Sequence, residues 1–99
     1  MYAVEYAEGV ANDLRSLRAH ERRRILDTMM EQLAYEPVRE TRNRKPLIGL
    51  KPPWDQDEPV WELRMGTFRV FYEVDDVGKR VIVHAVRRKL PHQTTEEIL

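Results

Sequence analysis

The sequence predicts an α+β fold: an N-terminal strand, an antiparallel two-helix hairpin, and a C-terminal three-stranded antiparallel meander. Apolar and polar residues alternate with the period of a strand near the N-terminus and again after residue 60. Between residues 10 and 33, apolar residues recur at helical spacing instead. The chain has 99 residues, about the size of one domain with one core. We therefore expect residues 1–99 to form a single domain with one small, mainly antiparallel sheet.

The N-terminal third predicts a strand followed by two helices. A short strand with one buried side is indicated by the alternation of Tyr2, Val4 and Tyr6 with polar or small residues. Apolar positions 10, 14 and 17 predict a first helix, and the connection near residues 18–20 turns the chain back. The second helix has a longer apolar stripe, made of Ile25, Leu26, Met29, Met30 and Leu33. It ends before Pro37, because a proline disfavours helical geometry in the residue that precedes it.

The connection from residue 37 to residue 59 predicts a long loop, because prolines 46, 52, 53 and 59 remove backbone donors. The apolar piece 47–50 is expected to tuck under the edge of the sheet. Loops too long to be simple connections are often functional, so Lys45 and Lys51 are candidate site residues. Basic residues between 39 and 51 are followed by acids at 55, 57, 58 and 62. The formal net charge of zero therefore hides local patches of each sign.

The C-terminal third predicts three strands, at 60–64, 67–74 and 80–86, joined by turns at 65–67 and 75–78. Gly78 is expected to take a positive backbone angle in the second turn. Alternation gathers one set of side chains on a buried face: Trp61, Leu63, Phe68, Val70, Tyr72 and Val74. The other face then holds Glu62, Arg64, Arg69, Phe71 and His84. Thr94 and Glu97 have the spacing of a capping box, which predicts a short helical turn over residues 95–99.

Composition excludes several classes of chemistry. The chain has no cysteine, which excludes a disulfide framework, a thiolate metal site and a thiol nucleophile. Neither a metal-ligand spacing nor a phosphate-binding glycine loop occurs, so we expect no metal and no cofactor. No apolar run approaches the roughly 20 residues that cross a bilayer, so a soluble, cytoplasmic protein without a membrane partner is expected. The balanced charge argues against indiscriminate binding to nucleic acid.

Arg69 is the strongest single candidate for a functional side chain. It lies in the middle of a predicted strand and points away from the aromatic core, and a guanidinium fork suits bidentate recognition of a phosphate. A cross-strand ion pair with Glu62 or Glu73 is the alternative, and both interpretations stay open. Glu62 is either a general base or a tether for the arginines. The tether is favoured, because two nearby arginines should lower the pKa of the carboxyl and weaken it as a base.

Two histidines and a basic cluster complete the candidate site. An imidazole titrates near neutrality and can move a proton to or from a ribose hydroxyl. His92 follows the cluster Arg87–Lys89 in a tail that can reach Arg69, whereas His84 lies on a strand and is expected to pack. Each histidine alone is more simply explained as structural. For His92, the expected proximity of Arg69 and the basic cluster favours a functional role over a structural one.

The order of these elements and several of their motifs resemble a known family. The motifs are Arg44–Lys51 (RKPLIGLK), Trp61–Arg64 (WELR), Gly66–Tyr72 (GTFRVFY), Ala85–Lys89 (AVRRK) and Thr94–Glu97 (TTEE). Together they are similar to the RelE/ParE superfamily of toxins from bacterial type II toxin–antitoxin systems, on its RelE/HigB-like side. The resemblance covers nearly the whole chain. The chain departs from RelE at Val60 and Glu62, where RelE carries lysines, and near Thr95, where RelE has a tyrosine.

The resemblance implies a ribosome-dependent endoribonuclease that cuts messenger RNA without a metal, by attack of a ribose 2'-hydroxyl on the adjacent phosphate. Its partners would be a cognate antitoxin, the ribosome and mRNA, with operator DNA reached only through the antitoxin. Arg69 would stabilise charge on the phosphate, His92 would be a candidate acid or base, and Lys89 would assist the leaving group. RNA would be bound by a further basic set: Lys45, Lys51, Arg64, Arg87 and Arg88. Glu62 and His84 would support the site.

Two other functions stay open at this point. A ParE-like toxin has the same fold but inhibits DNA gyrase by binding, which requires no acid and base pair. A degenerate member would keep only the binding of its antitoxin and the regulation of its operon.

Overall fold

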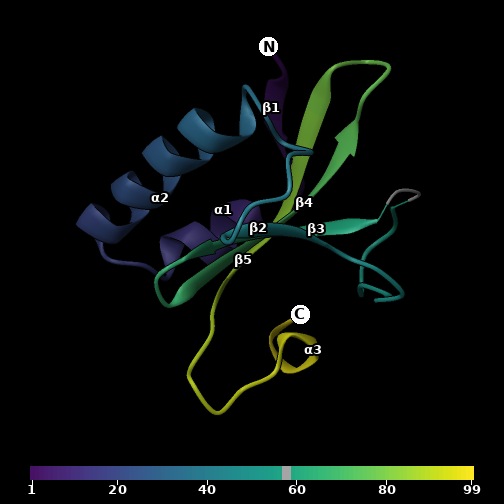
Figure 1. Cartoon of the computed structure of the whole chain (residues 1–99). Coiled ribbons are helices and arrows are strands. Elements are labelled where there is room, and N and C mark those ends of the chain that lie inside the picture. The colour runs from purple at the N-terminus through teal and green to yellow at the C-terminus, as the bar shows by residue number, and fades with distance from the viewer. Residues whose placement is uncertain (57–58) are drawn as a thin grey trace.

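The computed structural model describes residues 1–56 and 59–99, and its centre is a five-stranded sheet in the order β1-β5-β4-β3-β2 (Figure 1). Strand β1 runs parallel to β5, and every other pair of neighbours is antiparallel. The strands are β1 Ala3–Tyr6, β2 Arg44–Leu47, β3 Val60–Met65, β4 Phe68–Asp75 and β5 Arg80–Arg88. The predicted α+β class and the C-terminal meander are confirmed.

Helices α1 (Val10–Arg15) and α2 (Ala19–Leu33) pack on one side of the sheet, which we call the helix face. The six side chains predicted to share a buried face all lie in this core cluster, which confirms that prediction: Trp61, Leu63, Phe68, Val70, Tyr72 and Val74. The predicted stripe of α2 is right except at Met30, which is 50% exposed. Ile25, Met29 and Leu33 follow each other at intervals of four residues, and Met30 is turned about 100° away from Met29.

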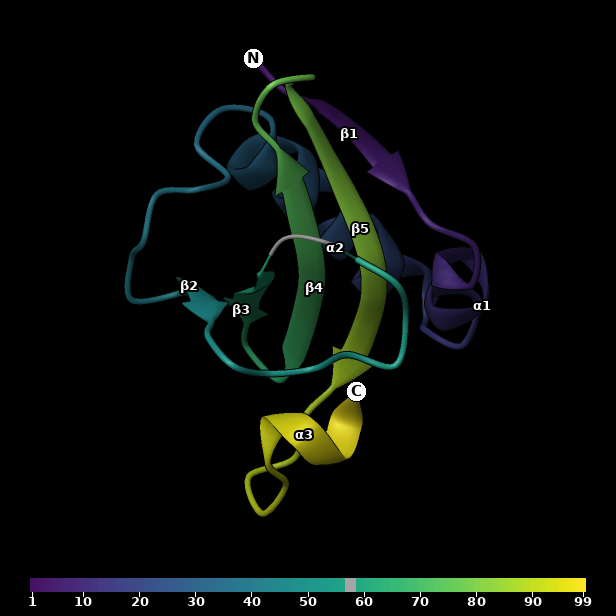
Figure 2. The same ribbon diagram turned by 90° about the vertical axis from the view of Figure 1, so that its right-hand side faces the viewer.

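A second apolar cluster covers part of the opposite side of the sheet, which we call the loop face. Val60, Phe71 and Ala85 are buried there beneath Ile98, which belongs to the short C-terminal helix α3 (Thr95–Ile98). In Figure 2 the teal segment that follows β2 passes across β4 and β5 on this face, while α2 lies behind the sheet. Leu47, Leu50 and Trp54 anchor that segment to the cluster. The loop face is therefore covered in part by packed residues.

Strand β2 was not predicted, because the proline-rich region was expected to hold little regular structure. Pro46 lies within it, opposite Trp61. A proline is tolerated here because β2 is an edge strand. The guanidinium of Arg44, only 5% exposed, donates from Nη1 to the carbonyl of Gln32 (2.8 Å) and thereby ties β2 to the end of α2. Of the acidic run that follows, residues 57 and 58 lie outside the described residues.

Both predicted turns are present. Gly66 takes a φ of 60° between β3 and β4, where a residue without a Cβ is favoured. In the turn between β4 and β5, the positive φ belongs to Lys79 (54°) and not to Gly78, so that detail was wrong. The predicted capping box of α3 is confirmed, because Thr94 and Glu97 each accept a hydrogen bond from the backbone N–H of the other.

A β-bulge interrupts the pairing of β4 with β5. Phe71 pairs with Ala85, yet the next residue, Tyr72, pairs with Val83, so His84 is the extra residue. The bulge shifts the alternation of β5 by one residue from that point onward. It therefore determines which side chains of the basic cluster after His84 share a face with Arg69.

Candidate functional site

Three arginines lie side by side across the loop face. Arg64 of β3 is the Cα partner of Arg69 on β4, and Arg69 is the Cα partner of Arg87 on β5. Neighbouring strands are about 4.8 Å apart, and like charges directly opposite each other on a sheet are unfavourable. An anion bound on this row would relieve that repulsion.

Arg69 occupies the middle of the row and is only 8% exposed. Its Nη1 donates to the carbonyls of Gly66 (2.7 Å) and Phe68 (2.8 Å). Its Nε is buried and finds no hydrogen-bond partner within residues 1–56 and 59–99. Burial lowers the pKa of this guanidinium, the charge of Arg64 lowers it further, and the charge of Glu62 opposes both. The site therefore holds a cation in an environment that disfavours its charge.

Neither of the ion pairs considered for Arg69 forms. Glu73 is bound to His84 instead, with 2.7 Å between Oε1 and Nε2. Glu62, which is 3% exposed, accepts a hydrogen bond at Oε2 from the hydroxyl of Thr95 (3.3 Å). Within the described part of the chain it makes no ion pair, although its charge raises the pKa of Arg69. Its other oxygen, Oε1, has no hydrogen-bond partner there either.

Arg87 shares the face of Arg69 but is held by protein groups. Its Nη1 donates to Asp13 of α1 (2.6 Å), and its Nε donates to the carbonyl of Ile98 in α3 (2.9 Å). Asp13 also accepts the backbone N–H of Val86 (3.0 Å), in the half of β5 that β1 does not reach. Arg87 thus fixes α1 and α3 at one end of the sheet. Sequence reasoning missed Asp13, because 74 residues separate it from Arg87 and no local pattern links them.

The rest of the basic cluster is divided between two faces. Arg88 lies over the ring of Phe68 on the helix face (4.7 Å from its Cζ to the ring centroid) and pairs with Glu21 of α2 at 3.4 Å. Lys89 follows β5, where its N–H donates to the carbonyl of Thr67 (2.6 Å). The structure therefore does not bring Arg88 together with Arg69.

The two candidate histidines have different surroundings. His84 stacks on Trp54, with 5.2 Å between ring centroids and 9° between planes, and also bonds Glu73. The expectation that it packs is confirmed. His92 is exposed in a turn that the hydrogen bond from Gln93 N–H to the carbonyl of Leu90 closes (3.0 Å). No contact joins His92 to Arg69 in the part of the chain described.

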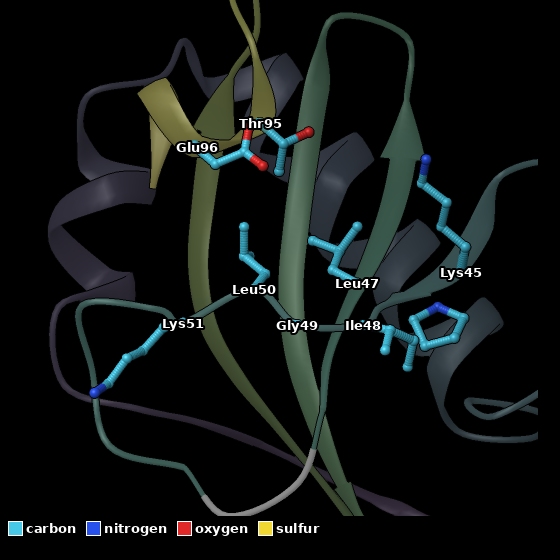
Figure 3. Close-up of a pocket in the computed structure, with 9 residues that line it drawn as sticks. Lys45, Leu47, Ile48, Gly49, Leu50, Lys51, Thr95 and Glu96 are labelled. Atoms are coloured by element: carbon cyan, nitrogen blue, oxygen red, sulfur yellow. The ribbon is translucent and has the colours of Figure 1, made fainter.

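A cavity of about 630 Å³ opens beside this site, between the segment after β2 and helix α3 (Figure 3). Lys45 and Lys51 lie at its two ends, with Leu47 and Leu50 between them and α3 above. It is lined by Lys45, Pro46, Leu47, Ile48, Gly49, Leu50, Lys51, Thr95 and Glu96. Thr95 joins this cavity to Glu62 through its hydroxyl. The lining thus combines two leucines, a lysine at each end and the carboxylate of Glu96 on the side of α3.

Within residues 1–56 and 59–99, no group of three or more histidine, aspartate or glutamate side chains is placed to bind a metal ion. The helices of the same residues include none that has the length and apolar character of a bilayer span.

Solved structures of toxin–antitoxin systems have the same fold. The archaeal RelE–RelB complex from Pyrococcus horikoshii OT3 matches with a TM-score of 0.70 and 28% identity, over 91% of this chain and 97% of that one. The RelBE2 toxin–antitoxin complex from Mycobacterium tuberculosis matches with a TM-score of 0.69 and 24% identity, over 89% and 98%. The isolated Escherichia coli RelE toxin matches with a TM-score of 0.59 and 17% identity, over 98% and 94%.

No protein-family model and no curated protein sequence matches the chain. The likeness therefore lies in the three-dimensional structure, and it spans nearly the full length of the RelE toxins. The predicted resemblance to RelE is confirmed at the level of the fold.

Proposed function

We propose that the protein is the toxin of a type II toxin–antitoxin system and cleaves messenger RNA on the ribosome. The observation that supports this most directly is Arg69, a nearly buried guanidinium with an unpartnered Nε in a row of three arginines. A phosphodiester bound over this row would supply the missing negative charge. The RelE-like fold supports the same function.

Glu62 is the general base of this proposal. Its charge acts on Arg69, and its Oε1 has no partner in the described structure. Oε1 takes the proton of the ribose 2'-hydroxyl, and the 2'-oxygen attacks the adjacent phosphorus while Arg69 stabilises the charge that develops on the phosphate. The bond from phosphorus to the 5'-oxygen breaks. The products are a 2',3'-cyclic phosphate and a free 5'-hydroxyl.

Lys89 or His92 donates the proton that the leaving 5'-oxygen takes up. Both follow β5, and His92 lies in an exposed turn of the tail. Imidazole is the side chain that most often transfers protons in enzymes, which favours His92 over Lys89 as the acid. Lys45 and Lys51 bind the RNA backbone at the two ends of the neighbouring cavity.

The protein partner of this proposal is an antitoxin. The matched structures from P. horikoshii and M. tuberculosis are complexes of toxin with antitoxin. In this chain an antitoxin segment that covers the arginine row would block the phosphate site. Ribosome and mRNA complete the set of partners.

The test is cleavage of ribosome-bound message by the purified wild-type protein and two variants, Arg69→Gln and Glu62→Gln, read by primer extension. Loss of Arg69 should slow cleavage by about 10²–10³-fold, as for the loss of one charge-stabilising donor. Loss of Glu62 should slow it by about 10²–10⁴-fold, as for the loss of a general base. The 3' end of the product should be a 2',3'-cyclic phosphate.

Arg23→Gln is the matched control, because Arg23 is exposed on α2 and remote from the loop face. A DNA gyrase supercoiling assay on the same preparations separates the alternatives. Gyrase inhibition without cleavage would mean a ParE-like protein. Wild-type protein that is inactive in both assays, yet binds its antitoxin, would be a degenerate member. Either result would overturn the nuclease.

A further inference from the structure

A second hollow, of about 480 Å³, lies beside the β3–β4 turn, between α2 and the end of β3. We call it the arginine groove. It is lined by Arg24, Thr28, Gln32, Thr41, Arg42, Asn43, Leu63, Arg64, Met65 and Gly66.

The charge of this groove is uncompensated. Its lining includes Arg24, Arg42 and Arg64 but no acidic residue. The side chains of these three arginines make no hydrogen bond or ion pair with the residues that the structure describes. Arg80 and Arg87, in contrast, are each paired with a carboxylate. In a chain with a net charge of zero, three free guanidiniums around one hollow indicate a site for a polyanion.

The arginine groove is continuous with the candidate phosphate site. Arg64 lines the groove and is also the Cα partner of Arg69. Gly66 lines it as well, and the carbonyl of Gly66 accepts the hydrogen bond from Arg69 Nη1. A chain of phosphates with one linkage at Arg69 can therefore pass Arg64 at the β3–β4 turn and continue toward Arg42 and Arg24.

The chemistry of the lining favours RNA over a protein partner. A stable protein interface needs apolar anchors at its centre, whereas most of this lining is guanidinium, hydroxyl and amide. Leu63 is only 2% exposed, and Met65 packs against the core of the helix face, so the lining offers no cluster of apolar anchors. Arginine, threonine and asparagine side chains are the donors that usually contact phosphate oxygens.

We infer that the arginine groove binds the RNA that flanks the cleaved linkage, with Arg24 and Arg42 each on a backbone phosphate. This inference rests on the proposed nuclease function and extends it, because it gives the RNA a direction across the molecule. The groove contributes to the affinity for RNA and to its placement, and takes no part in the chemical step.

The experiment measures binding of 2'-O-methyl oligonucleotides, which cannot be cleaved, by fluorescence anisotropy. A trinucleotide and a nonanucleotide are compared at about 50 and 200 mM salt for wild type and the double variant Arg24→Gln/Arg42→Gln. Each phosphate contact on a single strand contributes about 0.7 to the slope of log affinity against log salt. Two lost contacts over a fourfold change in salt amount to about sevenfold.

We expect the nonanucleotide affinity of the wild type to fall about sevenfold more between the two salts than that of the double variant. The trinucleotide should bind both proteins equally. The matched control is Arg18→Gln/Arg23→Gln, which removes the same charge from exposed residues at and near the start of α2, outside the groove. It should behave as wild type, so that an effect of net charge alone is excluded.

Equal salt dependence of the double variant and the wild type on the nonanucleotide would overturn the inference. Equal affinity of the wild type for both oligonucleotide lengths would overturn it as well. A double variant that keeps its affinity for RNA but loses its affinity for the antitoxin would also overturn it, because the groove would then be a protein-binding surface. The proposed function is judged separately by ribosome-dependent cleavage. Cleavage without length-dependent binding would contradict only the RNA-binding role of the groove. Length-dependent binding without cleavage would contradict the nuclease function.

Discussion

Replacement of Arg69 by methionine is expected to stabilise the protein. Burial and the neighbouring charge of Arg64 both lower the pKa of this guanidinium, which means that the folded state disfavours its charged form. The buried Nε also lacks an acceptor in the described structure. Methionine has a similar length and flexibility and can fill the same space without a charge or a donor.

The expected size follows from the hydrogen bonds of Arg69. Relief of an unsatisfied buried donor contributes about 1–3 kcal/mol. Two hydrogen bonds to carbonyls are lost, each with a net contribution of about 0.5–1.5 kcal/mol. The carbonyl of Gly66 is in an exposed turn and can bind water instead, which reduces that loss. The removal of repulsion from Arg64 outweighs the lost attraction to Glu62. We therefore expect a stabilisation of about 1 kcal/mol, or about 4–8 °C in Tm for a domain of this size.

The assay is urea and thermal unfolding of the wild type, Arg69→Met and Arg87→Met. Arg87 is the matched comparison because it is the Cα partner of Arg69 but is paired with Asp13. Its replacement leaves a carboxylate that is 21% exposed without its partner and should destabilise the protein by about 2 kcal/mol. The two variants should thus shift the urea midpoint in opposite directions with unchanged m-values.

A fall in Tm of Arg69→Met by several degrees would refute this reasoning, because it would mean that the carbonyl contacts outweigh the burial of the charge. A rise for both variants would refute the assignment of Arg87 as a structural residue.

Two further outcomes are expected. Trp54→Ala removes the stack on His84, so it should lower the free energy of unfolding by about 2 kcal/mol. Hydrogen exchange should rise in residues 48–56 but not in the strands. A uniform rise in exchange would contradict the anchoring role of Trp54. The N–H of Gly78, and then Arg80, hold the pKa of Asp75 below its usual 3.8. The carboxylate therefore adds stability above that pH, and this stability is lost as the pH falls through the lower folded value. Asp75→Asn should thus be less stable than wild type at neutral pH, and the difference should disappear as the carboxylate is protonated. A difference that persists in acid would contradict that linkage.

Local patterns were enough to predict most of the fold. The period-2 alternation from Trp61 to Val74 placed six side chains on the helix face, because one buried face requires apolar residues at every second position. Gly66 marked the first turn of the meander, and Thr94 with Glu97 marked the start of α3. These features depend only on residues close in the sequence. Strand β2 was missed because its four residues include a proline, and only the edge position makes that proline acceptable.

The site was predicted less completely, because the register of the sheet decides which charged side chains lie next to each other. Strict alternation from Val83 would put Arg87 on the helix face and Arg88 beside Arg69. The bulge at His84 reverses this, so that Arg87 joins the arginine row and Arg88 pairs with α2. A bulge of this kind has no clear local signal in the sequence.

The sequence by itself determined the class of fold, the buried face of the meander and the identity of Arg69 as a side chain opposite the core. The tertiary structure decided which cations are free. Asp13 neutralises Arg87 from 74 residues away, Glu62 turns to Thr95, and Arg69 is left buried with an unpartnered Nε. The physical reason is that alternation is a local property of the backbone, whereas the pairing of charges depends on distant segments that only the folded chain brings together.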